Sequence, residues 1–153
     1  MRPMPGNERS LMHLGESMAE SMETAGKEPD MEQLRPVVLI VEDEFLLRMD
    51  SAAAIEEAGF EVLQAANAEE AIAILRMRSD ISVVFTDIQM PGSMDGLKLA
   101  RFVRDRWPPI KIIATSGLVA LGEGDLPEGG VFIAKPYTAT RIAATLRSLA
   151  GLA

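Results

Sequence analysis

Five short, mostly apolar segments constrain the fold of this chain more than any other feature. Each is too short for an ordinary buried helix, and most are rich in β-branched residues, which is typical of strands buried on both faces. The five segments are Val37–Val41, Phe60–Ala65, Ser82–Thr86, Ile110–Thr115 and Val131–Ala134. Helical patterns lie between them, and this alternation predicts right-handed βαβ crossovers and an α/β fold with a parallel sheet.

The predicted helices have recognisable beginnings and ends. Asn67 and Asp95 are expected N-caps, and Gly59 is an expected C′ glycine. The four predicted helices are Phe45–Ala58, the segment from Asn67 to about Arg78, Gly96–Trp107 and Thr138–Leu149. The connection between Gly117 and Gly130 is rich in glycine, so we expect the fourth helix of the alternating series to be short or absent there.

Polar residues follow four of the five predicted strands. Glu42-Asp43 follows the first strand, Asp87 the third, Ser116 the fourth and Lys135 the fifth. The carboxyl ends of parallel strands point at one crevice, so these groups are expected to meet there. Three carboxylates tolerate one another only with a cation between them, and oxygen ligands without histidine or cysteine suit Mg²⁺. A lysine and a hydroxyl beside that metal predict a site for phosphoryl transfer.

Each of these residues also has an ordinary structural interpretation. The acids of 42–44 could stabilise a helix N-terminus, and Asp87 before Met90-Pro91 could be a turn aspartate. Ser116-Gly117 is common in loops, and Phe132 on a buried strand is a core residue whatever else it does. Their joint position at strand ends favours the functional interpretation.

Together these motifs resemble the receiver domain of two-component response regulators. The resemblance covers about residues 36–150 and rests on Glu42-Asp43, Asp87–Pro91, Ser116-Gly117 and Lys135–Tyr137 in this order. It implies a flavodoxin-like, doubly wound, five-stranded parallel sheet with strand order 2-1-3-4-5. It also implies a signalling protein that catalyses only its own phosphorylation and dephosphorylation.

The resemblance assigns a role to each residue of the constellation. Asp87 would accept a phosphoryl group from a kinase phosphohistidine, and Ser116 and Lys135 would contact the phosphoryl oxygens. Phe132 would rotate inward when Ser116 moves, and the Lys135–Pro136 bond would be cis. The residues implied to hold Mg²⁺ are Glu42, Asp43, Asp87 and the backbone carbonyl of Gln89.

The chain departs from the common receiver pattern in several places. The first acidic pair is Glu-Asp, and the loop Gly92–Met94 is one residue longer than usual. Phe132 has no hydroxyl group, and the weak helix after Ser116 alters a surface that many receivers use for output. The basic residues of the third predicted helix are expected to form a solvated face; they are Lys98, Arg101, Arg104 and Arg106.

We divide the chain into an N-terminal extension, residues 1–35, and a receiver domain, residues 36–153. The extension is expected to be flexible; a docking or dimerising helix and an internal translation start at Met31 remain alternatives. No output domain fits after the last helix, so we expect a stand-alone receiver that is a monomer or weak dimer. Its partners would be a sensor histidine kinase or phosphotransfer protein and a downstream protein target.

Composition and missing motifs exclude or disfavour other classes of function. A net charge of −8 disfavours direct DNA or membrane binding, and the absence of cysteine fits a cytoplasmic protein. No G-x-G-x-x-G follows the first strand, the acidic first loop disfavours a flavin carrier, and Gln89 stands where an aspartate-nucleophile phosphatase needs an acid. A receiver-like binding module that is never phosphorylated remains the alternative.

Overall fold

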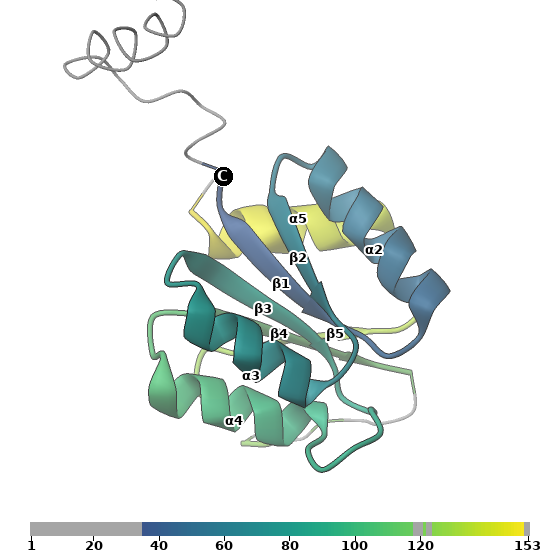
Figure 1. Cartoon of the computed structure of the whole chain (residues 1–153). Helices are drawn as coiled ribbons and strands as arrows, with labels where there is room; N and C mark the ends of the chain where they lie inside the picture. Colours follow the sequence, from purple (N-terminus) through teal and green to yellow (C-terminus); the bar gives the residue numbers. More distant parts are fainter. Residues whose placement is uncertain (1–34, 118–120, 122–123, 152–153) are drawn as a thin grey trace, which may run out of the picture. The chain divides into compact units, whose positions relative to one another are not determined.

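The computed structural model describes residues 35–117, 121 and 124–151, and these contain a five-stranded parallel sheet. The strands lie in the order β2-β1-β3-β4-β5, and all four neighbouring pairs are parallel (Figure 1). Their bounds are Val37–Val41 for β1, Glu61–Ala65 for β2, Ile81–Asp87 for β3, Lys111–Ser116 for β4 and Val131–Ala134 for β5. The predicted fold class and strand order are confirmed, with strand ends that differ from the prediction by one residue at most. The prediction for residues 1–34 lies outside the described residues.

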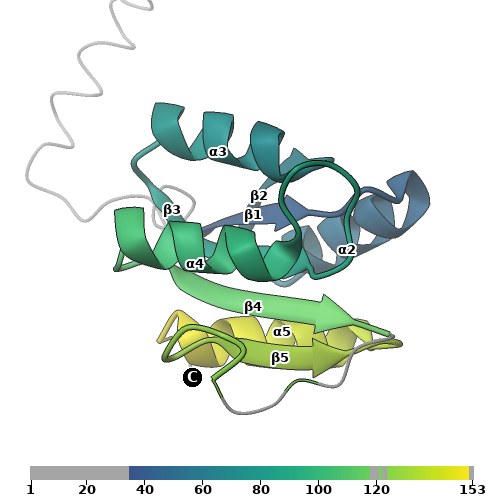
Figure 2. The same ribbon diagram turned by 90° about the horizontal axis from the view of Figure 1, so that it is seen from below.

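Helices cover both faces of the sheet, as Figures 1 and 2 show. Helices α2 (Phe45–Glu57) and α5 (Ala139–Leu149) pack on one face, and α3 (Ala68–Met77) and α4 (Gly96–Arg106) pack on the other. Within the described ranges, no helix is long and apolar enough to cross a membrane.

The alternation of side chains along the central strand β1 builds two separate cores. Val38 and Ile40 pack with residues of α2 and α5, whereas Leu39 and Val41 pack with residues of α3 and α4. Every residue of β1 is buried. Burying one such aliphatic side chain stabilises the fold by roughly 1.5–3 kcal/mol, which explains why this strand contains no polar residue.

The helix ends have the caps that the sequence predicts at Asn67, Asp95 and Gly59, and Thr138 is a further N-cap that was not predicted. The side chains of Asn67, Asp95 and Thr138 accept hydrogen bonds from the backbone N–H groups of Glu70, Lys98 and Arg141, respectively. Gly59 follows α2 with φ +105°, a left-handed conformation that favours glycine. These local signals fix where the helices begin and end, and therefore where each strand presents its last residue.

The connection between β4 and β5 is held against α4 by two arginines. Arg101 donates a hydrogen bond to the carbonyl of Asp125 at 3.0 Å, and Arg104 donates one to the carbonyl of Glu128 at 2.9 Å. Leu126 packs against the core beside α4. Residues 117, 121 and 124–130, the part of this connection that is described, contain no helix. The prediction that any helix between Gly117 and Gly130 is short or absent also concerns residues 118–120 and 122–123, which lie outside the described residues.

Helix α4 begins with a glycine that allows its first turn to touch the backbone of Asp87. The N–H of Gly96 donates to the carbonyl of Ile88 at 2.8 Å. A Cβ atom at position 96 would lie 2.1 Å from the carbonyl oxygen of Asp87, closer than atoms can approach. The missing side chain at Gly96 therefore helps to fix the position of Asp87.

We predict that Gly96→Ala destabilises the protein by about 1–3 kcal/mol, as overpacking does elsewhere. Helix propensity alone would give the opposite sign, because alanine is the better helix former. The matched control is Gly117→Ala, whose added Cβ would lie 3.5 Å from Lys135 Cβ, an ordinary contact. Urea unfolding of both variants checks the prediction, and a Gly96→Ala variant as stable as the wild type would contradict it.

Candidate functional site

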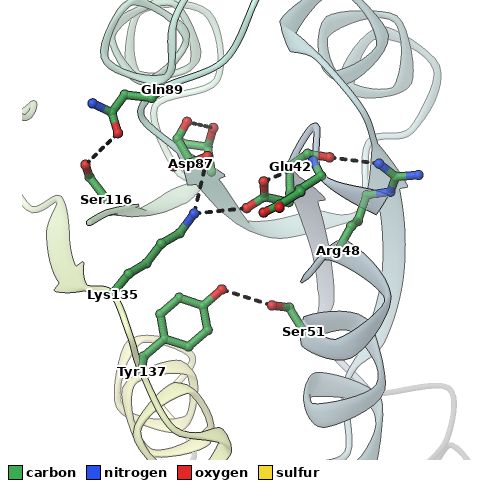
Figure 3. A network of polar contacts seen from close by, with 10 residues as sticks. Glu42, Arg48, Ser51, Asp87, Gln89, Ser116, Lys135 and Tyr137 are labelled. Carbon is green, nitrogen blue, oxygen red and sulfur yellow. Dashed lines mark hydrogen bonds and ion pairs between the residues drawn. The ribbon is translucent and has the colours of Figure 1, made fainter. Parts of the chain in front are cut away.

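The carboxyl ends of four strands bring the predicted polar residues together. Glu42 follows β1, Asp87 ends β3, Ser116 ends β4, and Lys135 follows β5. Figure 3 shows the side chain of Lys135 directed toward Asp87 and Glu42, although Glu42 and Lys135 are 93 residues apart in sequence. The Ser116 hydroxyl points to Gln89 instead. The sheet thus assembles the constellation that the sequence predicts.

Three carboxylates form the acidic part of the site. One oxygen each from Glu42, Asp43 and Asp87 lies within 4.8 Å of the other two. Glu42 and Asp87 are only 4% and 6% exposed, whereas Asp43 is exposed. Asp87 Oδ1 is buried and has no hydrogen-bond partner in the described part of the chain. A buried carboxylate oxygen without a donor, beside two further carboxylates, fits a hard cation such as Mg²⁺.

Lys135 lies between the two buried carboxylates. Its Nζ atom is 3.4 Å from Glu42 Oε1 and 3.4 Å from Asp87 Oδ2. Burial raises the pKa values of Glu42 and Asp87, although the charge of Lys135 acts in the opposite direction. Burial alone would lower the pKa of Lys135, but the charges of Asp87 and Glu42 prevail and raise it. One lysine therefore does not fully compensate the acids.

Helix α2 holds the loop that carries Glu42 and Asp43. Arg48 donates to the backbone carbonyl of Glu42 at 2.8 Å and to Gln64 Oε1 at 3.2 Å. The N–H of Glu44 donates to Glu42 Oε2 at 3.1 Å. Arg48 was not among the predicted site residues, because no motif indicates that a side chain on the first turns of a helix will reach back to a strand end.

The end of β4 is tied to both neighbouring strand ends. The N–H of Ile88 donates to the carbonyl of Thr115 at 2.9 Å, and the N–H of Lys135 donates to the carbonyl of Ser116 at 3.0 Å. Ser116 Oγ donates to Gln89 Oε1 at 3.0 Å (Figure 3). The sequence analysis placed the Gln89 carbonyl among the Mg²⁺ ligands, and it did not predict this side-chain contact with Ser116.

The segment after Lys135 is fastened to α2. The Lys135–Pro136 peptide bond is cis, as predicted. The Tyr137 hydroxyl lies 3.0 Å from Ser51 Oγ on α2, and the Tyr137 ring packs on Phe85 with centroids 5.8 Å apart. Tyr137 belongs to the Lys135–Tyr137 motif, but no sequence motif predicts that Ser51 is its partner.

Two further predicted features lie at the edges of the site. Phe132 was predicted to be a core residue, but it is only half-buried on β5. Alternation with Ile133, which packs toward α2 and α5, places Phe132 on the opposite face of the sheet. In the lengthened loop, Gly92 has φ +107° and Ser93 donates to the carboxylate of Glu69 on α3. The extra residue thus bends the loop toward α3.

Comparison with known proteins identifies the family. The family model of the response regulator receiver domain matches residues 38–147. The chain belongs to the response regulator receiver family. Receiver domains are signalling modules of two-component systems, and they bind Mg²⁺ at an acidic pocket of the kind formed here by Glu42, Asp43 and Asp87.

Curated relatives of two architectures are similar to this receiver. The sensor kinase CckA of Brucella abortus is 32% identical over 88% of this chain, which spans only 15% of the kinase. The response regulator receiver protein CpdR of the same organism is 32% identical over 65% of this chain and 84% of CpdR. A receiver protein structure from Sinorhizobium medicae has a TM-score of 0.71 and 27% identity, covering 76% of this chain and 95% of that one.

The raised pKa values predict how pH affects the metal-free receiver. The pKa of Asp87 is higher in the folded protein than its unfolded value, which is near 3.8. Such a group stabilises the fold at pH values below its unfolded pKa. This contribution is lost as the pH rises through the folded pKa. Asp87→Asn should therefore raise the melting temperature at pH 7.5 in EDTA, with a smaller or no gain at pH 4.

Asp80→Asn is the control with the opposite sign, because hydrogen bonds from Arg78 lower the pKa of Asp80. That variant should lose stability at pH 7.5 rather than gain it. Calorimetry of both variants at the two pH values checks the prediction. A melting temperature of Asp87→Asn below that of the wild type at pH 7.5 would contradict it.

Proposed function

We propose that this receiver accepts a phosphoryl group on Asp87 from the phosphohistidine of a sensor histidine kinase or phosphotransfer protein, in a Mg²⁺-dependent reaction. The observation that carries the proposal is the meeting of three carboxylates and Lys135 at the carboxyl ends of parallel strands, with Asp87 Oδ1 buried and unpaired within the described residues. That oxygen has a lone pair available for attack.

In the proposed reaction an Asp87 carboxylate oxygen attacks the phosphorus atom. A P–O bond forms, the P–N bond of the phosphohistidine breaks, and the imidazole leaves with the electron pair and takes up a proton. Lys135, 3.4 Å from Asp87 Oδ2, would remain beside the new acyl phosphate and neutralise part of its charge. Hydrolysis of the acyl phosphate by water would return the protein to its resting state.

Glu42, Asp43, Asp87 and the backbone carbonyl of Gln89 are the groups that would hold Mg²⁺. The bound ion would supply charge neutralisation and orient the phosphoryl oxygens. Ser116 would donate its hydroxyl to a phosphoryl oxygen, and Phe132 would follow its movement. A site with three acids and one lysine repels phosphate unless a cation is bound, which is why the reaction should require the metal.

A surface for the kinase lies next to the site. The first turns of α2 expose Phe45, Leu46 and Met49, with Leu46 74% exposed. Leu47 lines a hollow of about 430 Å³ together with Gly117, Lys135, Pro136 and Tyr137. An apolar surface beside the phosphoacceptor suits an apolar helix face of the donor, which must bring its histidine to Asp87.

We further propose that the protein works as a stand-alone receiver in the cytoplasm, as a monomer or weak dimer. The 84% coverage of CpdR supports the stand-alone form, and the absence of cysteine fits a reducing compartment. It would signal through contact with a downstream protein or serve as a phosphate sink. It would catalyse no reaction beyond its own phosphorylation and dephosphorylation.

Acetyl phosphate with Mg²⁺ should label the wild type on Asp87, seen as the mass of one added phosphoryl group. Asp87→Asn should reduce labelling to background, because an amide is a poor nucleophile, and EDTA should do the same. Asp95→Asn is the matched control, since asparagine also caps a helix, and it should label normally. Labelling of Asp87→Asn would refute the assignment, and an unlabelled wild type would favour the binding module.

Leu46→Glu should slow phosphotransfer from a host kinase by about tenfold, which corresponds to losing about 1.4 kcal/mol of docking energy. Labelling by acetyl phosphate should not change, because Leu46 projects away from the core. Met77→Glu is the matched control, an equally exposed apolar residue on α3. The donor kinase is identified first, by testing which phosphorylated host kinases transfer their phosphoryl group to the wild type. Equal effects of both variants would exclude α2 as the docking surface.

A further inference from the structure

The side chain of Gln89 joins the two strand ends that carry the chemistry. Gln89 lies two residues after Asp87, and its backbone N–H is among the groups that lower the pKa of Asp87. Its Oε1 atom accepts the hydroxyl hydrogen of Ser116 at 3.0 Å (Figure 3). One residue thus contacts both the predicted phosphoacceptor and the predicted switch hydroxyl.

A serine hydroxyl has a single hydrogen to donate. In the structure this hydrogen is given to Gln89, whereas the proposed function needs it for a phosphoryl oxygen on Asp87. Both bonds cannot exist at once. Gln89 and the phosphoryl group therefore compete for Ser116.

We propose that Gln89 is a positioning residue that holds the Ser116 hydroxyl in the unphosphorylated protein and so sets how readily the phosphorylated conformation forms. The inference rests on the proposed function, because the competing acceptor is the phosphoryl group on Asp87. Gln89 acts through Ser116 and takes no part in the chemical step with its side chain.

The surroundings of the two residues allow the Ser116 hydroxyl to exchange Gln89 for a phosphoryl oxygen as its acceptor. Ser116 is 2% exposed, so its hydroxyl gains from an internal acceptor in either state, whereas Gln89 is exposed and can turn to water when released. The Gln89 amide is neutral, so it supplies an acceptor without adding a fourth charge beside Asp87. A hydrogen bond of this kind is worth little in net terms, so its loss should shift the equilibrium measurably without unfolding the protein.

The test measures binding of beryllofluoride, a mimic of the phosphoryl group, by calorimetry in excess Mg²⁺ on the full chain. Gln89→Met keeps the size of the side chain but removes the acceptor, and it should tighten binding by about threefold to tenfold. Ser116→Ala should weaken binding. In the Ser116→Ala background, Gln89→Met should have no effect beyond about twofold, because there is no hydroxyl left to hold.

Thr145→Val is the control, since the Thr145 hydroxyl donates to the carbonyl of Arg141 within α5 and not to a residue of the site. It should change beryllofluoride affinity by less than about twofold. A second measurement uses the resting state alone. The effects of Gln89→Met and Ser116→Ala on urea unfolding without beryllofluoride should be non-additive, as expected for two partners of one hydrogen bond.

The outcomes separate this inference from the proposed function. A wild type that does not bind beryllofluoride overturns both. A wild type that binds, with Gln89→Met binding equally or more weakly, overturns the role of Gln89 alone. A gain that persists in the Ser116→Ala background, or additive effects on unfolding, also overturns it.

Discussion

The attraction between Lys135 and two buried carboxylates is the interaction on which this site depends. Glu42 follows β1 and Asp87 ends the neighbouring strand β3, and each approaches the lysine to 3.4 Å. Removing the lysine from such a buried group typically costs roughly 3–5 kcal/mol, because the carboxylates that remain are desolvated and uncompensated. Yet the pKa values of both acids remain raised. Lys135 thus holds the two carboxylates together, but its single charge does not fully compensate them.

The sheet makes this arrangement possible because the strands that lead to Glu42 and Asp87 are almost entirely buried. β1 is buried along its full length, so the first position where Glu42 can meet polar groups is the carboxyl end of the strand. The same is true of Asp87 at the end of β3. Gly96 then brings the first turn of α4 against the Asp87 backbone. The acids have little freedom to separate, so their mutual repulsion is compensated by charge rather than by movement.

The sequence predicted the fold, the helix caps and the meeting of the polar strand ends, because periodicity, turn residues and parallel topology are local or general rules. It did not predict contacts that long side chains make across the fold. Arg48 reaching the Glu42 carbonyl and Gln89 reaching Ser116 are of this kind. The basic face of α4 is solvated as predicted at Lys98, Arg101 and Arg106. The sequence did not predict that Arg101 and Arg104 donate to carbonyls of the β4–β5 connection. Such contacts depend on where the loops lie.

The contacts of Arg101 and Arg104 connect α4 to the site in a second way. Its first residue touches the backbone of Asp87, and its later turns hold residues 125–128, which follow Ser116 in sequence. Backbone carbonyls are the acceptors, so the contact depends on the path of the chain rather than on the acidic side chains of Asp125 and Glu128. The described residues 125–128 of the β4–β5 connection are thereby fixed to α4, the same helix whose first turn contacts the backbone of Asp87.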